Sequence, residues 1–191
     1  MLAGMWFWKR SPGRRDQARD PAAGGAAVAH LLMVCTGNIC RSPTAQGVLR
    51  AKLRLAGMDR SVWVDSAGTH GFHRAEPPDP RAIRHAARRG YDIAGLRARP
   101  VDQADFGRFH WILAMDEGNL DWLREHAPAQ GQAQLGLLLE QAPDLGEREV
   151  PDPYYGPDVG FDRVLDLVEL ACDAVVARLA RADPGAHPGR L

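Results

Sequence analysis

Two side chains that could do chemistry lie close together in the stretch VCTGNICRSP, Val34 to Pro43. Cys35 stands near its beginning and Arg41 near its end. A cysteine thiolate is a strong nucleophile, and the guanidinium of arginine is a planar fork that matches two oxygens of a phosphate. If the stretch curls, both groups can address one tetrahedral anion. Their spacing therefore indicates nucleophilic attack on a bound phosphate.

The residues on either side of this stretch predict the loop that would form the curl. The apolar run AVAHLLMV (27–34) is typical of a strand buried on both faces of a parallel sheet. A loop from a strand to a helix can direct its backbone N–H groups at one anion, aided by the helix dipole. Gly37 is expected to permit the unusual backbone angles of the curl, and the positive surroundings favour the thiolate of Cys35. The following helix is indicated by apolar residues at helical spacing, namely Ala45, Val48, Leu49 and Leu53.

Other uses of these cysteines and of this loop find less support. Cys35 and Cys40 could bind zinc, but no second pair of Cys, or of Cys and His, lies at a fitting distance. A nucleotide-binding loop of the Walker type needs a lysine and flanking glycines that this stretch lacks. From the residues alone, a merely structural loop or one that binds phosphate without catalysis stays open. Cys172 falls in the apolar stripe of a long helix and is expected in the core.

The composition is that of one ordinary domain. The chain has 191 residues, 45% of them hydrophobic, and its 24 basic residues balance 24 acidic ones. A zero net charge does not favour nucleic acid or anionic lipid as a partner. No stretch approaches the apolar length that a transmembrane helix needs. Three cysteines are an odd number, with two in one loop, which indicates a reducing compartment such as the cytoplasm rather than a disulfide framework.

Both ends of the chain differ in composition from the middle. Residues 1–26 end in a stretch rich in Ala, Gly, Arg and Asp and predict a disordered extension. The alternative is that Trp6, Phe7 and Trp8 insert into a membrane surface, although this apolar run is short. Residues 183–191 predict a flexible tail. The chemistry is therefore expected within a single catalytic domain, residues 27–182.

Predicted strands and helices alternate along this middle part. The strand patterns cover 27–34, 62–68, 110–114 and 134–140, and the helix patterns cover 45–53, 80–90, 116–127 and 160–181. Such alternation implies right-handed crossovers and a three-layer α/β/α fold around a four-stranded parallel sheet. Sheets of this kind bind ligands outside the carboxyl ends of their strands. Cys35 follows the first strand, so the predicted phosphate-binding loop lies where a site is expected.

These residues resemble a known family. VCTGNICRSP is similar to the Cys-x5-Arg-Ser signature loop of the low-molecular-weight protein tyrosine phosphatases, here of bacterial type. VPDPYYG (150–156) resembles the Asp-Pro-Tyr segment of that family. Three further stretches are similar in order and spacing: DSAGTHGFH (65–73), PPDPRA (77–82) and ILAMDEGNL (112–120). The resemblance covers residues 28 to 181.

The resemblance implies a hydrolase that removes phosphate from phosphotyrosine through a phosphocysteine intermediate. Cys35 would attack phosphorus, Arg41 would hold the equatorial oxygens, and Asp152 would protonate the leaving phenol and later activate water. No metal or other cofactor is needed, because the loop and Arg41 supply the positive charge. The substrate would be a phosphotyrosine-containing protein, such as a bacterial tyrosine kinase.

The resemblance also implies which residues surround the substrate. Ser42 would donate a hydrogen bond to the sulfur of Cys35, and Asn38, helped by Ser66, would lock the loop. Tyr154 and Tyr155 would form a wall beside the phenyl ring, although from the residues alone they could be simple loop anchors. The substrate-binding residues expected on this basis are Thr36, Gly37, Asn38, Ile39, Cys40, Ser42, Tyr154 and Tyr155.

Several positions test the resemblance. From the residues alone, Asp152 could merely start a turn before proline, and Asp79 and Asp116 are expected to be helix caps. Gln46 stands where glutamate is frequent and is expected on a solvated face. Ala75 stands where glycine is usual, in the loop beside the pocket.

Two related functions are alternatives. Arsenate reductases share the loop but relay electrons through further cysteines near the middle of the chain, and residues 41–171 contain none. Protein-arginine phosphatases carry threonine where Ile39 stands, and an apolar residue there suits a phenyl phosphate better. A non-catalytic phosphate-binding module finds no support, because nucleophile, arginine and acid are all present.

Overall fold

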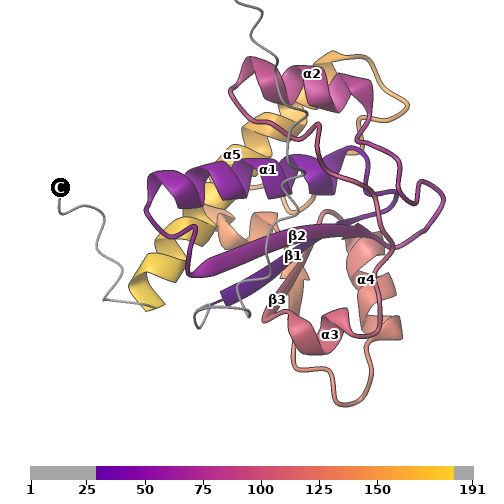
Figure 1. The fold of residues 1–191 in the computed structure, drawn as a ribbon, viewed down its shortest axis with the longest axis vertical. Coiled ribbons are helices and arrows are strands. Elements are labelled where there is room, and N and C mark those ends of the chain that lie inside the picture. The colour runs from indigo at the N-terminus through magenta and orange to yellow at the C-terminus, as the bar shows by residue number, and fades with distance from the viewer. Residues whose placement is uncertain (1–28, 183–191) are drawn as a thin grey trace, which may run out of the picture.

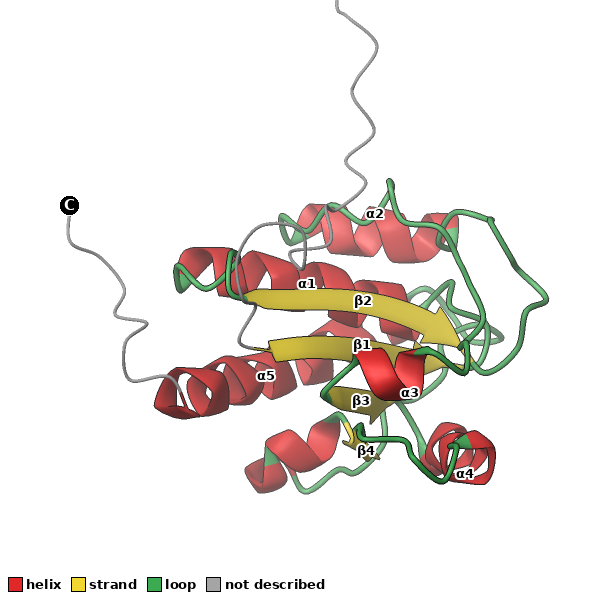
Figure 2. Cartoon of the chain, turned by 60° about the horizontal axis from the view of Figure 1, so that its bottom comes forward, coloured by secondary structure: helices red, strands yellow, loops and turns green. Residues whose placement is uncertain are grey.

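Four parallel strands form the middle layer of the fold. They are β1 (Ala29–Cys35), β2 (Val62–Gly68), β3 (Trp111–Ala114) and β4 (Gln134–Leu137), and they lie side by side in the order β2-β1-β3-β4. Figure 2 shows the strands in this order. The computed structural model describes residues 29–182; the expected extension 1–26 and tail 183–191 lie outside the described residues.

Helices cover both faces of this sheet (Figure 1). One face carries α1 (Arg41–Leu55), α2 (Pro80–Arg88) and α5 (Val159–Ala182), and α1 packs on α5 along much of its length. The other face carries α3 (Asp105–Arg108) and α4 (Glu117–His126). The expected three-layer α/β/α fold with a four-stranded parallel sheet is therefore confirmed.

The middle strand explains why its sequence is apolar without interruption. Leu31 and Met33 of β1 face the core beneath α1 and α5, and Leu32 and Val34 face the core beneath α3 and α4. All four side chains are fully buried, as expected for a strand with helices on both faces. Cys172 on α5 is also fully buried, which confirms its predicted place in the core.

The expected elements are found, most with ends shifted by one to four residues, and two differences have physical reasons. The fourth strand ends at Leu137, because the chain then turns into a 3-10 helix at Leu139–Gln141. The apolar run continues through this turn because Leu138 and Leu139 are buried in the core beneath α1 and α5, so hydrophobicity alone could not mark the end of the strand. The short helix α3 was not expected, because four residues are too few to show a helical period.

Two helices begin at the caps that the sequence indicated. The Asp79 side chain accepts a hydrogen bond from the backbone N–H of Arg81 and begins α2. The Asp116 side chain accepts one from the N–H of Asn119 and begins α4. Past the end of α2, Gly90 has a left-handed backbone with φ 84°, the expected helix stop.

Ala75, which stands where glycine is usual in the family, has a strained backbone. Its φ is 66°, in the left-handed region where a Cβ atom is unfavourable. Its N–H donates to the carbonyl of Ala98 at 2.8 Å, and the N–H of Ala98 donates back to Glu76 at 2.9 Å. These two bonds hold the loop in a conformation that the alanine itself disfavours.

We predict that Ala75→Gly stabilises the protein by about 0.5–1 kcal/mol, because relief of the strain exceeds the extra entropy of an unfolded glycine. Guanidinium unfolding measures this change. Ala177→Gly, at an exposed position inside α5, is the matched control and should lower the stability by about 1 kcal/mol. An Ala75→Gly variant that is less stable than the parent would contradict the inference that the backbone of Ala75 is strained.

Candidate active site

The site forms where the order of the strands reverses. β2 pairs with one side of β1 and β3 with the other, so the segments after β1 and β3 separate at the carboxyl edge of the sheet. Open α/β sheets bind ligands at such a point. Cys35 ends β1 and Arg41 begins α1, and residues 36–40 curl between them.

The sulfur of Cys35 lies at the bottom of this curl. Its Sγ is 3.0 Å from the hydroxyl oxygen of Ser42 and receives the backbone N–H of Asn38 at 3.3 Å. The residue is 3% exposed. Two polar contacts of this kind, at the N-terminal end of a helix, stabilise negative charge on sulfur. The site can therefore hold a nucleophilic thiolate.

Asn38 fixes the shape of the loop. Its φ of 56° is left-handed, which asparagine tolerates better than most residues. Its side-chain N–H groups donate to the hydroxyls of Ser42 and Ser66, both at 2.9 Å, and its carbonyl accepts the backbone N–H of Arg99 at 2.9 Å. Three segments thus bond to one amide, and the contact with Ser66 is the one that the resemblance implied.

At two glycines in this region, Gly37 and Gly68, neighbouring atoms lie close to where a Cβ atom would stand. The left-handed φ of this loop belongs to Asn38 and not to Gly37. A Cβ on Gly37 would lie 3.1 Å from the ring of His73, so the position is crowded rather than twisted. A Cβ on Gly68, at the end of β2, would lie 2.7 Å from the carbonyl oxygen of Thr36. Sequence reasoning missed Gly68, because the contact joins the end of β2 to the loop after β1, which lies far away in the sequence.

Arg41 is almost wholly buried and fully engaged. Its Nη1 donates to a carboxylate oxygen of Asp116 at 2.5 Å and to the carbonyl of Val150 at 3.2 Å. Its Nη2 donates to a carboxylate oxygen of Asp152 at 3.1 Å and to the hydroxyl of Thr36 at 3.3 Å. Burial lowers the pKa of the guanidinium, but the neighbouring negative groups outweigh it and hold the pKa above the ordinary value. Arg41 is a fixed positive charge.

Asp116 therefore has two functions, and sequence reasoning found only one. One carboxylate oxygen caps α4 through the N–H of Asn119, and the other holds Arg41. The side chain of Asn119 in turn donates to the Thr36 hydroxyl at 3.1 Å, which links α4 to the loop. The signal for the second role was the position of Asp116 just after β3, at the same sheet edge as Cys35.

Asp152 lies at the rim, beside Arg41. Its carboxylate accepts from Arg41 through one oxygen and from the backbone N–H of Tyr154 through the other, at 3.2 Å. Its side chain is 47% exposed, whereas that of Arg41 is 3% exposed. The structure thus brings together the three residues expected to be catalytic: Cys35, Arg41 and Asp152.

Aromatic side chains border the opening. The rings of Tyr154 and Tyr155 meet edge to face with centroids 4.8 Å apart. Tyr155 is 96% exposed, so it is not a buried loop anchor. The ring of His73, which pairs with Glu76 at 2.7 Å, lies 6.4 Å from that of Tyr154. These rings give the rim an apolar surface suited to an aryl group.

Two loop residues that were expected to touch substrate point inward instead. Ile39 and Cys40 are 8% and 5% exposed, and their side chains pack in a cluster beneath α2 with Ala82 and Ile93. Burial and the nearby charge of Asp79 raise the pKa of the Cys40 thiol far above its usual range. A bound anion would therefore meet the backbone N–H groups of these two residues rather than their side chains.

The expectation that Gln46 lies on a solvated face is wrong. Gln46 is 2% exposed, and its amide lies 2.7 Å from the hydroxyl of Ser66. The reason is that this face of α1 lies against β2, and the polar Ser66 of that strand faces it. Gln46 thus supports Ser66, which in turn supports Asn38.

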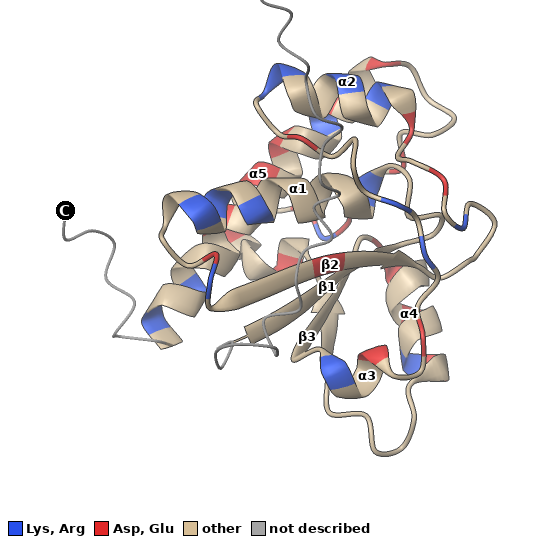
Figure 3. Cartoon of the chain, in the orientation of Figure 1, with Lys and Arg blue, Asp and Glu red and all other residues tan. Residues whose placement is uncertain are grey.

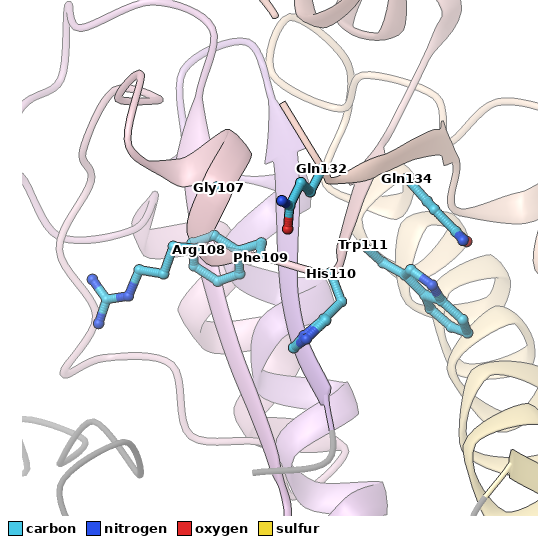
Figure 4. A pocket seen from close by; sticks show the side chains of 7 residues that line it. All are labelled: Gly107, Arg108, Phe109, His110, Trp111, Gln132 and Gln134. Atoms are coloured by element: carbon cyan, nitrogen blue, oxygen red, sulfur yellow. The ribbon is translucent and has the colours of Figure 1, made fainter. Parts of the chain in front are cut away.

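A separate hollow of about 290 Å³ lies at the opposite edge of the sheet, lined by Gly107, Arg108, Phe109, His110, Trp111, Gln132 and Gln134 (Figure 4). These residues precede or begin β3 and β4, so the hollow lies at the amino ends of the strands. It holds no cysteine and is distant from the loop after β1. We therefore place the candidate active site at the loop.

Neither a metal cluster nor a membrane-spanning helix is found among the described residues. Within 29–182, no three His, Cys, Asp or Glu side chains gather as they would around a metal ion. None of the helices in that range is both long and apolar enough to cross a membrane.

The chain is similar to known proteins along most of its length. A family model described as low molecular weight phosphotyrosine protein phosphatase matches residues 30–184. A low molecular weight protein-tyrosine-phosphatase of Streptomyces coelicolor is 43% identical over 147 residues, covering 75% of this chain and 89% of that protein. YfkJ of Bacillus subtilis, of the same description, is 34% identical over 151 residues, covering 79% and 96%. The crystal structure of a protein tyrosine phosphatase from Entamoeba histolytica, with Hepes in its active site, has a TM-score of 0.77 at 36% identity and covers 81% of this chain and 98% of that one.

We predict that iodoacetate at neutral pH alkylates Cys35 well before Cys40 and Cys172. All three are buried, but burial raises the pKa of Cys40 and of Cys172, whereas Cys35 has donors at its sulfur and Arg41 beside it to hold the reagent's carboxylate. Peptide mass spectrometry measures the order of labelling, and inorganic phosphate should slow only the reaction at Cys35. Labelling of Cys40 at the same rate as Cys35 would contradict the assignment of Cys35 as the reactive thiol of the site.

Proposed function

The chain belongs to the low molecular weight phosphotyrosine protein phosphatase family, and we propose that it hydrolyses phosphotyrosine in proteins through a phosphocysteine intermediate. One observation carries the proposal: the sulfur of Cys35 faces the same loop interior as the buried guanidinium of Arg41, which in turn holds the carboxylate of Asp152. A nucleophile, a phosphate-binding cation and a proton donor are the groups that this reaction requires.

The first step transfers the phosphoryl group to sulfur. The thiolate of Cys35 attacks phosphorus, the bond from phosphorus to the tyrosyl oxygen breaks, and the phenolate takes a proton from Asp152. Arg41 turns its fork from Asp152 to the phosphoryl oxygens, and the loop N–H groups bind the same oxygens as charge develops on them. The contact between the Ser42 hydroxyl and Cys35 keeps the thiolate stable.

The second step returns the enzyme to its starting state. Water attacks the phosphocysteine, gives a proton to the carboxylate of Asp152, and releases inorganic phosphate and the thiolate of Cys35. Ser42 stabilises this departing thiolate as it did the attacking one. Arg41 and the backbone N–H groups thus stabilise charge on the phosphoryl oxygens, whereas Ser42 stabilises charge on sulfur.

The substrate class follows from the rim. Tyr154 and Tyr155 border the opening with exposed aromatic surface, which suits the phenyl ring of phosphotyrosine. The Entamoeba histolytica structure has Hepes in its active site, and the sulfonate of Hepes is a tetrahedral anion like phosphate. The partner is a phosphotyrosine-containing protein in the cytoplasm, such as a bacterial tyrosine kinase, and residues 27–182 form the catalytic domain.

Two alternatives receive less support. An arsenate reductase would need relay cysteines, and beyond the loop the sequence offers only Cys172, which is fully buried between α5 and α1. A non-catalytic phosphate-binding module would have no use for the ion pair between Arg41 and Asp152 at the rim.

We predict that Cys35→Ser abolishes turnover of aryl phosphates yet still binds vanadate or phosphate, because the loop N–H groups and Arg41 remain. Arg41→Lys should lose most of the activity, since a point charge cannot replace the planar fork. Steady-state rates and anion binding by calorimetry measure the two effects. Substantial turnover by Cys35→Ser would rule out the covalent mechanism.

Asp152→Asn should affect substrates according to their leaving groups. The phenol of tyrosine has a pKa of about 10, so its expulsion at neutral pH benefits from a proton, whereas a nitrophenolate leaves more readily without one. We expect kcat/KM for phenyl phosphate to fall about a hundredfold or more, and that for nitrophenyl phosphate to fall much less. Equal losses in kcat/KM, which reports the first step, would remove Asp152 from the role of acid.

A further inference from the structure

We propose that Arg81 is a positioning residue that holds the Asp152 segment in register with the phosphate-binding loop, an inference that rests on the proposed function. Arg81 is the second residue of α2 and touches neither Cys35 nor Arg41 in any contact described above. Its importance lies in what it joins, because its guanidinium bonds to Asp79 before α2 and to the backbone of Tyr154.

The first of these bonds is to Asp79. Nε of Arg81 donates to one carboxylate oxygen at 3.1 Å and Nη2 donates to the other at 2.9 Å, a two-point pairing. Burial raises the pKa of Asp79, but the hydrogen bonds from Arg81 outweigh this and hold the pKa below its ordinary value. The Asp79 side chain is only 9% exposed, so the pair is fixed rather than loosely solvated.

Asp79 is itself fastened to the phosphate-binding loop. Its backbone N–H donates to the carbonyl of Ile39 at 2.8 Å. Its carboxylate also caps α2 through the backbone N–H of Arg81. The start of α2 and the middle of the loop are therefore joined directly through Asp79.

The second bond of Arg81 reaches the other side of the site. Nη2 donates to the backbone carbonyl of Tyr154 at 3.0 Å. The guanidinium also lies over the ring of Phe161, 4.7 Å from its centroid, at the start of α5. Tyr154 is two residues beyond Asp152, and its N–H donates to the Asp152 carboxylate. Arg81 thus holds the turn that aims this carboxylate.

These contacts close a ring around the mouth of the site. From Ile39 it passes through Asp79 and Arg81 to Tyr154, then through Asp152 back to Arg41. The ring begins and ends in one loop, so the distance from the proton donor to the loop is set by Arg81 on one side. When Arg41 turns to phosphate, Arg81 is the remaining charged tether of the Asp152 segment within this ring.

The neighbouring residue Arg84 provides a matched comparison. It lies one turn further along α2 and pairs with the exposed side chain of Asp158 at 2.6 Å. Its own side chain is 45% exposed, against 28% for Arg81. Figure 3 shows the basic positions of α2 in blue beside acidic positions of α5 in red. The two arginines share helix and charge but differ in what they hold.

The test compares Arg81→Met and Arg84→Met on two substrates. We expect kcat/KM of Arg81→Met for phenyl phosphate to fall about tenfold or more, because a misplaced acid loses much of its effect. For 2,4-dinitrophenyl phosphate, whose leaving group needs no proton, the fall should stay within about threefold. Arg84→Met should leave both values within about twofold, and vanadate should bind all three proteins equally.

Further variants separate positioning from folding. Arg81→Lys and Asp79→Asn, which keeps a helix cap, should show the same dependence on the leaving group. In an Asp152→Asn background, Arg81→Met should cause no further loss on phenyl phosphate. Three results would overturn the proposal. The first is that Arg81→Met lowers kcat/KM equally for both substrates, and the second is that it lowers kcat/KM for phenyl phosphate no more than Arg84→Met does. The third is that Arg81→Met lowers kcat/KM for phenyl phosphate as much in the Asp152→Asn background as in the parent protein. Failure of the parent protein to hydrolyse either substrate would instead contradict the proposed function.

Discussion

Burying the guanidinium of Arg41 requires that the fold provide it with polar partners. Arg41 is 3% exposed, and a charge removed from water is tolerated only where partners with good geometry replace the solvent. Its partners are the carboxylates of Asp116 and Asp152, the carbonyl of Val150 and the hydroxyl of Thr36. They come from segments that follow β1, β3 and β4, so only a sheet that gathers these carboxyl ends can satisfy the charge. The need to satisfy the charge of Arg41 therefore constrains both the order of the strands and the chemistry of the loop.

The loop itself is held by polar contacts where a core would use apolar ones. Asn38 adopts a left-handed backbone, and the hydrogen bonds of its side-chain amide with Ser42, Ser66 and Arg99 hold it in that conformation. Behind this amide, Gln46 supports Ser66 from α1. Every member of the network has a partner, which is the condition under which buried polar groups make a site rigid instead of weakening it.

The sequence predicted most of the fold because its signals are local. Apolar runs bounded by turn residues located the strands, and the uninterrupted run before Cys35 indicated a strand with helices on both faces. The roles of Cys35 and Arg41 also followed from one short stretch. Asp152 needed the family resemblance, because an Asp-Pro pair is common in turns. Gln46, Gly68 and the second role of Asp116 were missed, since each depends on which strand or helix lies opposite, and that is a property of the topology.

The ion pair between Arg41 and Asp152 bears on which anions can use this site. An incoming anion must displace a carboxylate that already occupies one side of the guanidinium. A phosphate monoester dianion brings twice the charge of that carboxylate and more oxygens for the loop N–H groups, so the exchange favours it. Chloride or acetate offers no more than the resident carboxylate does. The carboxylate of Asp152 thus competes with incoming anions for Arg41, so the abundant monoanions of the cell bind weakly at this site.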